Sequence, residues 1–582
     1  MKKKLLLLVS CILILGSANA QSPDWQWAKA IGGIGVNGDK GFSITTDALG
    51  NVYTCGRFTG TADFDPGAGI FNLTAIGEVD IFISKLDSAG NFIWARAMSG
   101  VGYEAAISIA VDASGNVFTT GGFQSTVDFD PGPGIFNLTA PGPVGTYDIF
   151  ISKLDSAGNF VWAKRIGSID NDSGNSIALD DSANVYTTGY FNITVDFDPG
   201  PGVFNLTSPG YDDIFVSKLD SSGNFVWAKR IGGSGYSYQV GLSITIDRTG
   251  SGDVYTTGYF QNTVDFDPGP GVFNLTADTT ISTYNNDIFI SRLDASGNFV
   301  WAKRMGGPGV DAGRSIALDT SGNVYIAGQF SGTSDFNPDT AVTYYLNSAG
   351  LYDIFISKMN TGGNFIWAKA LGGTAQDIAL SVAIDAFSYV YTTGSFAATA
   401  DFDPGPGVFN LTPAGSVNIF VSKLDSAGNF VWAKATGGTG GDAGCSIALS
   451  ASGNVHVTGE FSSPSISFGS TTLMTVSIGT ADIFIAKLDS SAGIPTGNNW
   501  SENFAGSIFP NPFTTTATIS FDKEVRGAAF SLYNLLGEKV AEISGINGES
   551  YQLNRASLTS GMYVYEVKEK GRSIGRGKAV VY

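Results

Sequence analysis

The segment Asp148–Gly167, DIFISKLDSAGNFVWAKRIG, decides the fold of this 582-residue chain, because close versions of it recur along most of the length. Each interval between recurrences spans 65 to 74 residues and holds four strand-like runs. A period of that length with four strands is typical of a β-propeller rather than of a solenoid of short coils. The tryptophans that mark the recurrences are Trp27, Trp94, Trp162, Trp227, Trp301, Trp367 and Trp432.

The third unit illustrates the strands. The runs Ser176–Asp180 and Asn184–Phe191 are separated by a short Asp-Ser-Ala turn, and Asp213–Asp220 and Phe225–Ile231 are joined by Ser-Ser-Gly-Asn. Short turns with Gly and Asn between β-rich runs predict hairpins. Both faces of these runs are apolar or small, as expected for sheets that are covered on both sides. We expect the tryptophan to pack between neighbouring sheets.

The count of motifs predicts how the chain closes. The second-strand and third-strand motifs each occur seven times, but the last third strand, Asp482–Asp489, has no FVWAK run after it. An unpaired run of that type, Trp25–Ile31, stands instead before the first unit. We therefore predict an all-β fold, a seven-bladed β-propeller closed by the N-terminal strand, which leaves no exposed edge in the ring.

These repeats, D-x-F-x-x-K-L-D-x-x-G-N-x-x-W followed by S-I-x-x-D-x-S-G-N-V-Y-x-T-G, resemble the bacterial secreted β-propeller repeat, over about Trp25–Asp489. The resemblance implies a fold and no activity, because propellers host unrelated functions.

The ends of the chain predict export. Residues 1–20 have three lysines, an apolar run and Ala18-Asn19-Ala20, the pattern of a secretory signal peptide. We assign 21–489 to the propeller, 490–506 to a linker and 507–582 to a separate C-terminal domain. No other segment is long and apolar enough to span a membrane. The net charge of −19 disfavours nucleic acid and anionic membranes as partners.

The C-terminal domain has landmarks of its own: Pro510-Asn511-Pro512, Ala529–Asn534, Leu536-Gly537-Glu538-Lys539-Val540 and Leu558–Tyr563. In this order they resemble the type A C-terminal sorting domain of the type IX secretion system. The resemblance implies a small β-sandwich that engages the secretion machinery, and delivery to the outer cell surface or the medium in a Bacteroidetes-type bacterium.

An acidic insert, TVDFDPGPGVFNLT, follows the second strand in most units. In extended chain its two aspartates point the same way, and the Phe between them turns back onto the sheet. One interpretation is a turn capped by Asp; another is a Ca²⁺ site, since calcium binds carboxylate and carbonyl oxygens. Catalysis is disfavoured because near-identical copies lack the asymmetry that an acid and a base need. The candidate calcium ligands are Asp63, Asp65, Asp128, Asp130, Asp196, Asp198, Asp265, Asp267, Asp401 and Asp403.

Few other residues are candidates for catalysis or metal binding. The one histidine, His456, stands where other units have Tyr, and we interpret it as a packed strand residue. Cys55 and Cys445 fall in units that closure would make neighbours, so either a disulfide or two free thiols is open. A hydrolase would need acidic or basic loop residues that are unique to one unit, and Asp311 and Arg314, in the entry loop of the fifth unit, come nearest to this.

The loop-rich face and channel mouth are the candidate site, since function usually sits on variable loops. The first hypothesis is an exported binding or adhesion module for a glycan or protein. The alternatives are a polysaccharide hydrolase or lyase with its site in the channel mouth, and a structural surface-layer component. The sequence therefore favours a protein that is not an enzyme and needs no cofactor apart from the calcium alternative.

Overall fold

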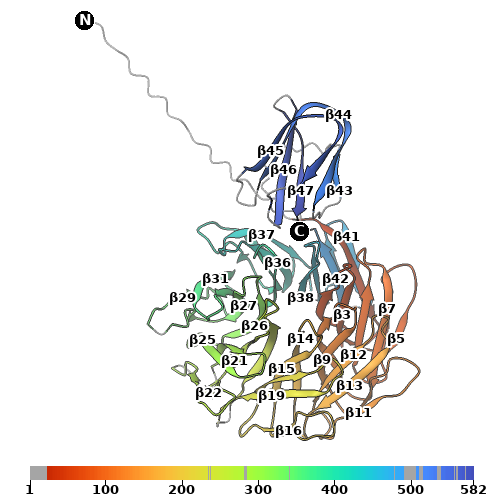
Figure 1. Cartoon of the computed structure of the whole chain (residues 1–582). Helices are drawn as coiled ribbons and strands as arrows, with labels where there is room; N and C mark the ends of the chain where they lie inside the picture. The colour runs from red at the N-terminus through yellow and green to blue at the C-terminus, as the bar shows by residue number, and fades with distance from the viewer. Residues whose placement is uncertain are drawn as a thin grey trace. The chain divides into compact units, whose positions relative to one another are not determined.

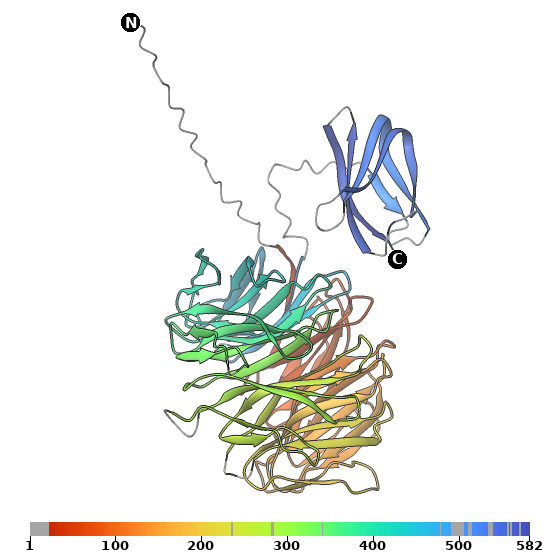
Figure 2. The ribbon, with the colours of Figure 1, turned by 60° about the vertical axis from the view of Figure 1, so that its left-hand side comes forward.

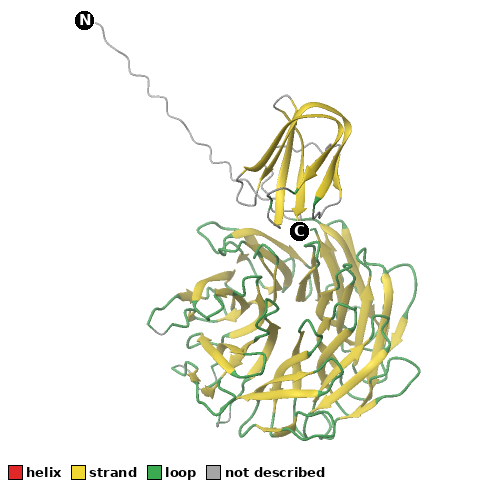
Figure 3. Cartoon of the chain, viewed as in Figure 1, coloured by secondary structure: helices red, strands yellow, loops and turns green. Residues whose placement is uncertain are grey.

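The computed structural model describes residues 23–489, except 234, 236, 281–284, 340 and 478, and residues 506–581, except 510–514, 534–538, 556–557, 559–560 and 570–571. Regular structure in these residues is entirely β-strand (Figure 3). They fall into two compact units, which lie within Asn19–Ile494 and Pro495–Tyr582. The predicted signal peptide and most of the linker lie outside the described residues.

The larger unit repeats four antiparallel strands, which we call inner, second, third and outer (Figure 1). The inner strands are β2 (Lys40–Thr46), β8 (Ala105–Val111), β14 (Ser173–Leu179), β20 (Val240–Ile246), β26 (Ala312–Leu318), β32 (Asp377–Ile384) and β38 (Asp442–Leu449). The second strands are β3 (Val52–Phe58), β9 (Val117–Phe123), β15 (Val185–Phe191), β21 (Val254–Phe260), β27 (Val324–Phe330), β33 (Val390–Phe396) and β39 (Val455–Phe461).

The third strands are buried almost throughout, as the apolar sequence on both faces predicts. They are β6 (Asp80–Leu86), β12 (Asp148–Leu154), β18 (Asp213–Leu219), β24 (Asp287–Leu293), β30 (Asp353–Met359), β36 (Asn418–Leu424) and β42 (Asp482–Leu488). The outer strands that follow them are β7 (Phe92–Gly100), β13 (Phe160–Ile166), β19 (Phe225–Ile231), β25 (Phe299–Met305), β31 (Phe365–Gly373) and β37 (Phe430–Thr436).

The N-terminal strand β1 (Trp25–Gly33) takes the outer position beside β42. The two are antiparallel, with Ala30 opposite Phe484 and Ile31 opposite Ile483. The pairing of these two predicted segments is therefore confirmed, although they lie at opposite ends of the repeats in sequence.

Hydrogen bonds between inner strands follow the same order around the units. The backbone N–H of Ile109 donates to Ser43 Oγ of the preceding unit, and this bond recurs from each inner strand to the one before it. The N–H of Ile44 in the first unit donates to Ser446 Oγ in the last, at 3.2 Å.

The hydrophobic clusters lie between units rather than within them. One joins Tyr53 and Trp94 of the first unit to Phe150 of the second, and another joins Phe82 of the first unit to Ile483 and Ile485 of β42. Consecutive units therefore share their cores, and they lie side by side in Figures 1 and 2.

The tryptophans pack between sheets, as predicted. Trp94 Nε1 donates to the carbonyl of Ser156 in the turn of the next unit, 3.3 Å away, and the bond recurs for five other tryptophans. A side chain at Gly158 would collide with the Trp94 ring, and its φ of +80° also favours glycine. Trp432 Nε1 is buried and has no partner among the residues that the structure describes.

The acidic inserts form short hairpins that were not predicted. Each begins after a second strand, and six of the seven pair with the outer strand of the preceding unit, as β10 does with β7, so they protect that edge. The hairpins are β4 (Thr61–Asp63) with β5 (Asn72–Thr74), β10 (Thr126–Asp128) with β11 (Asn137–Thr139), β16 (Thr194–Asp196) with β17 (Asn205–Thr207), β22 (Thr263–Asp265) with β23 (Asn274–Thr276), β28 (Thr333–Asp335) with β29 (Tyr345–Asn347), β34 (Ala400–Asp401) with β35 (Asn410–Leu411), and β40 (Ser465–Phe468) with β41 (Thr471–Met474).

The smaller unit contains β43 (Gly506–Phe509), β44 (Thr516–Tyr533), β45 (Lys539–Asn554), β46 (Gly561–Glu569) and β47 (Arg572–Val581). Hydrogen bonds connect these strands into one sheet, and register shifts between Ser520 and Phe530 divide β44 into two halves. Because Ile519 of the first half and Phe530 of the second belong to one buried cluster, the sheet encloses a core of its own. The described residues contain no helix that is long and apolar enough to cross a membrane.

Candidate functional site

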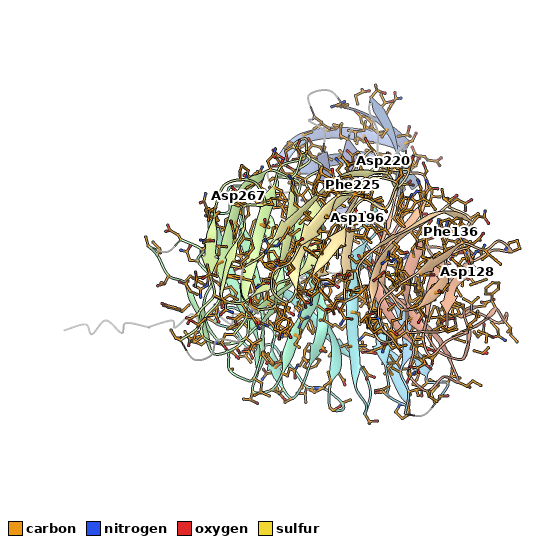
Figure 4. All side chains as sticks on the ribbon, turned by 90° about the horizontal axis from the view of Figure 1, so that it is seen from below. Asp128, Phe136, Asp196, Asp220, Phe225 and Asp267 are labelled. Carbon is orange, nitrogen blue, oxygen red and sulfur yellow. The ribbon has the colours of Figure 1, made fainter. Side chains whose placement is uncertain are left out.

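The insert hairpins use their first aspartate to hold the turn. Asp196 Oδ1 accepts hydrogen bonds from the N–H groups of Asp198 and Phe204, at 3.1 and 2.8 Å. Asp198 Oδ1 accepts from the N–H of Gly200, and Phe197 between the aspartates is fully buried against Phe191 and Phe215. Figure 4 shows Asp128, Asp196 and Asp267 following one another across neighbouring units. This bonding matches the turn interpretation.

The same carboxylates provide too few free oxygen ligands for calcium. Each hairpin brings two of them, whereas Ca²⁺ takes six to eight oxygens, and one oxygen of each is already bonded to backbone N–H groups. Within the described ranges no group of three or more His, Cys, Asp or Glu gathers as a metal site. The calcium site stays a prediction.

Shallow grooves lie on the rim between successive hairpins. A groove of about 380 Å³ runs over the outer strand β13 between Phe136 and Asp198, and a second, of about 340 Å³, occupies the same positions one unit further on. Arg165 in the first groove is already paired with Asp148. The grooves therefore repeat a structural pattern and bring together no distinct acid and base.

A second set of acids is buried where units meet, and Asp311 belongs to it. Asp311 Oδ2 accepts from the N–H of Gly307 and Oδ1 from that of Ser331, so one carboxylate ties three segments together. Asp172, Asp377 and Asp442 repeat the two bonds. Asp311 is thus a repeated structural clamp, and its interpretation as a distinctive catalytic acid is not supported by its position.

Each clamp faces the first residue of the third strand in the preceding unit. Burial raises the pKa of Asp311 to about 7, and the charge of Asp287 raises it as well. Burial likewise raises the pKa of Asp39 to about 7 and that of Glu104 to about 9, with the charges of Asp482 and Asp80 adding to it. These are pairs of buried carboxyls, which favour a protonated partner near neutral pH.

Three of these third-strand acids bind an arginine, although Asp213 is matched across the unit boundary by Gln239 and not by a second carboxyl. Arg165, Arg230 and Arg304 bind Asp148, Asp213 and Asp287 in the second, third and fourth units. The corresponding residues of other units are alanines, such as Ala30 and Ala370. In the sixth unit, where the cation is also missing, an amide, Asn418, replaces the acid.

The loop-rich end holds the residues in which the units differ most. The position before the last residue of the second strand is flanked by Gly and Phe in every unit, yet it holds Arg57, Gly122, Tyr190, Tyr259, Gln329, Ser395 and Glu460 in turn. The bulged residue of the inner strand varies as widely, through Phe42, Ile107, Asn175, Leu242, Arg314, Leu380 and Cys445.

Aromatic side chains gather there in the second, third and fourth units. Tyr103 and Tyr147 meet edge to face at 6.2 Å, and the Arg57 guanidinium lies 5.1 Å from the Tyr103 ring. Tyr211 and Tyr238 stack at 5.1 Å between ring centres, with 43% of each residue exposed. We call the following six residues the tyrosine arc: Tyr103, Tyr147, Tyr190, Tyr211, Tyr238 and Tyr259.

Charged groups of both signs accompany the arc. Asp212 acts electrostatically on Tyr190 and on Tyr259, and burial, together with the charges of Asp170 and Asp213, raises the pKa of Asp212 to about 6. Arg314 faces Tyr259 and donates from Nε to Gln329. Arg314 therefore lies at the mouth that was predicted as the site, whereas Asp311 does not act with it.

The remaining candidates are structural. His456 is 1% exposed, and burial and the Lys487 charge lower its pKa to about 4, so it packs as a neutral strand residue, as interpreted. Cys55 and Cys445 are free thiols, which excludes the disulfide alternative.

Sequence reasoning missed the tyrosine arc and the acid pairs. An Asp, Glu or Gln stands at the start of every inner strand, and this recurrence would have indicated the clamp. An alignment of the seven units would have shown a varied residue between a constant Gly and a constant Phe near the end of each second strand. That contrast would have indicated the mouth.

Comparisons with known proteins agree with the repeats and the tail. Residues 161–197 and 300–336 match the beta-propeller repeat, and residues 507–581 match the secretion system C-terminal sorting domain. The chain is thus an all-β protein that carries secreted propeller repeats and a type IX C-terminal sorting domain. That domain directs secretion to the outer cell surface or the extracellular space, and it implies interaction with the secretion machinery.

Among curated proteins, an uncharacterized WD repeat-containing protein of Acanthamoeba polyphaga mimivirus is 25% identical over 512 residues, covering 76% of this chain and 36% of that protein. A regulatory protein of Caulobacter vibrioides, FlaEY, is 26% identical over 205 residues, covering 33% of this chain and 20% of its own length. The chain spans about a third or less of the length of these relatives.

Solved structures give only distant likenesses. Sqt1 from Chaetomium thermophilum matches with a TM-score of 0.33 and 9% identity, over 75% of this chain and 97% of that one. A fungal alcohol oxidase in complex with copper matches with a TM-score of 0.36 and 10% identity, over 96% and 99%. Likenesses of this size carry no information about activity.

Proposed function

We propose that this chain is an exported binding module that presents the loop-rich mouth of a closed seven-bladed propeller to a glycan or a protein. In this proposal residues 1–20 are the signal peptide, 21–489 the propeller, 490–506 the linker and 507–582 the sorting domain. The propeller is the cargo that the type IX machinery delivers.

Three observations support the closed ring. Strand β1 completes the sheet of β42, the inner strands are bonded in a cycle that returns from Ser446 to Ile44, and one hydrophobic cluster joins β42 to the first unit. Seven copies of each repeated strand, with β1 counted as an outer strand, support seven blades.

The main support for a binding role is that the residues which differ between units lie at the mouth. Residues that build the scaffold, such as Ser43 and Phe58 and their counterparts, are the same in every unit. The two positions at the mouth vary through aromatic, cationic, anionic and small side chains. A framework that repeats while the residues of one mouth vary is expected when that mouth meets an asymmetric ligand.

The pair Asp212 and Asp170 favours a hydrolase as the second candidate. Asp212 has a raised pKa, Asp170 lies within electrostatic reach of it, and the position of Asp212 is occupied by Tyr147, Asn286 and Val417 in other units. A carboxyl that is unique to one unit and lies near a second one is the kind of arrangement on which glycoside hydrolysis is built. A structural surface-layer role gains no support from a varied mouth.

The test is a binding and turnover screen with the exported chain and a Tyr238→Ala variant, against neutral polysaccharides, anionic polysaccharides and purified extracellular proteins. The proposal expects binding that the substitution weakens, without release of shorter sugars. Release of shorter sugars that stops in an Asp212→Asn variant would establish the hydrolase instead. Binding that mouth substitutions never alter would overturn both.

A further inference from the structure

We propose that the tyrosine arc binds a neutral oligosaccharide, an inference that rests on the proposed function and narrows its ligand to one chemical class. The arc occupies one side of the mouth only. In the fifth and sixth units the position of Tyr190 and Tyr259 is held by Gln329 and Ser395, so the row of second-strand tyrosines ends there.

The arc contains exposed tyrosine rings on which a ligand can stack. Tyr211 and Tyr238 lie nearly parallel, with an interplanar angle of 6°, and come from loops of the third and fourth units. Both residues are 43% exposed, unlike the second-strand tyrosines Tyr53 and Tyr186, which are fully buried. An exposed tyrosine pairs an apolar ring with a polar hydroxyl, which suits a ligand whose C–H face is apolar and whose edge carries hydroxyls.

Polar groups at the arc provide both donors and acceptors. Asp212 is half-buried and acts electrostatically on Tyr190 and Tyr259, so it supplies a carboxylate acceptor near the arc for the hydroxyl groups of a sugar. Arg314, which acts electrostatically on Tyr259, provides N–H donors. A few polar groups set among aromatic side chains are the usual composition of a small-ligand site.

The balance of charge excludes a strongly charged occupant. Arg57 and Arg314 are offset by Asp170, Asp212 and other acids, while the chain as a whole carries −19. A polyanionic glycan would meet this negative field, and a basic peptide would meet the two arginines. Hydroxyl-rich neutral sugars satisfy the donors and acceptors with no uncompensated charge.

The experiment titrates the full exported chain with hexasaccharides of glucose, mannose and xylose, and with hexagalacturonate as the anionic comparison, by calorimetry and saturation-transfer NMR. Tyr211→Ala and Tyr238→Ala remove the stacked pair. Tyr345→Ala is the matched control, because Tyr345 is 59% exposed but lies on the hairpin strand β29, outside the mouth. Tyr190→Phe keeps the ring and removes one hydroxyl, so it separates stacking from hydrogen bonding without disturbing packing.

We expect at least one neutral hexasaccharide to bind, Tyr238→Ala to weaken it by about tenfold or more, and Tyr345→Ala to leave it unchanged. The inference is overturned if no neutral hexasaccharide binds up to about 10 mM, or if Tyr345→Ala weakens binding as much as Tyr238→Ala. If only hexagalacturonate or a protein binds in a Tyr238-dependent way, the neutral class is wrong while the binding role of the mouth stands.

Discussion

Replacing Ile31 by alanine tests whether the N-terminal strand belongs to the cooperative fold of the repeats. Ile31 is 1% exposed, lies opposite Ile483 and shares a buried cluster with Phe58 and Phe64. The substitution removes an ethyl and a methyl group, worth about 2 kcal/mol in transfer free energy. With the cavity that remains, the expected loss of unfolding free energy is about 3 kcal/mol, within the usual range for buried Ile-to-Ala changes.

Ile231→Ala is the matched control. Ile231 is fully buried in the same register position of β19, opposite Ile214, and its cluster contains Phe260 and Phe266 at the places of Phe58 and Phe64. The two sites differ chiefly in that β19 is continuous with its own unit, whereas β1 reaches β42 from the far end of the repeats. A closed ring predicts nearly equal losses at the two sites.

Urea unfolding followed by tryptophan fluorescence measures both variants. Residues 507–582 contain no tryptophan, so the signal does not report unfolding of the sorting domain. If Ile31→Ala costs less than about 1 kcal/mol while Ile231→Ala costs about 3 kcal/mol, β1 separates before the rest and the closed ring is wrong. A separate early transition for the Ile31 variant alone would lead to the same conclusion.

Three further predictions concern pH, calcium and export. The pKa values of Asp39 and Asp311 are raised from 3.8 to about 7 in the folded state, so between these two pH values the native protein holds protons that the unfolded chain has released. The stability that this proton binding contributes is fully present below about pH 4 and is lost as the pH rises through 7. Asp482→Asn, which copies the natural Asn418 facing Asp442, should therefore raise the melting temperature by about 1–3 °C at pH 8 and change it little at pH 5; a fall at pH 8 contradicts the pairing. If the hairpin aspartates hold calcium, excess chelator should lower the melting temperature, and an Asp196→Asn, Asp198→Asn variant should abolish that dependence; identical melts with and without chelator remove calcium from consideration. Deleting residues 507–582 should trap the chain in the periplasm, as measured by fractionation and immunoblotting. Appearance of the shortened chain in the medium would refute the export route.

Much of the fold is readable from the sequence because its determinants are local. The hairpin turns depend on Asp, Gly and Asn within five residues, as in Asp155–Asn159, where Asp155 Oδ1 accepts from the N–H groups of Ala157 and Asn159. The period of the tryptophans then repeats this local information around the units. The pairing of Trp25–Ile31 with Asp482–Asp489 follows from counting strands, since one unit lacks what the N-terminus supplies.

The features that sequence reasoning missed depend on contacts between units. Hairpin strands of two to four residues are too short to show a period, and β10 finds its partner β7 in the preceding unit. The carboxyl pair of Asp39 and Asp482 joins the two ends of the repeats, so neither acid looks unusual in its own surroundings. The tyrosine arc is likewise assembled from loops of different units, such as those that contain Tyr211 and Tyr238.

The buried acid clamps and the varied mouth are adjacent parts of one arrangement. Asp311 binds the backbone on both sides of the inner strand that carries Arg314, and Asp172 does the same for the strand that carries Asn175. Because backbone N–H groups and serine hydroxyls, and not the bulged side chains, bond to these carboxylates, the bulged residue can change from unit to unit without loss of the clamp. The clamps therefore hold the loops while leaving the mouth free to differ. Asn175→Ala removes the hydrogen bond that Asn175 Nδ2 donates to the Gly241 carbonyl, and it should cost only about 1 kcal/mol, the usual contribution of one such bond. A loss of several kcal/mol would mean that the mouth residues support the fold, and the separation between scaffold and binding surface would then be wrong.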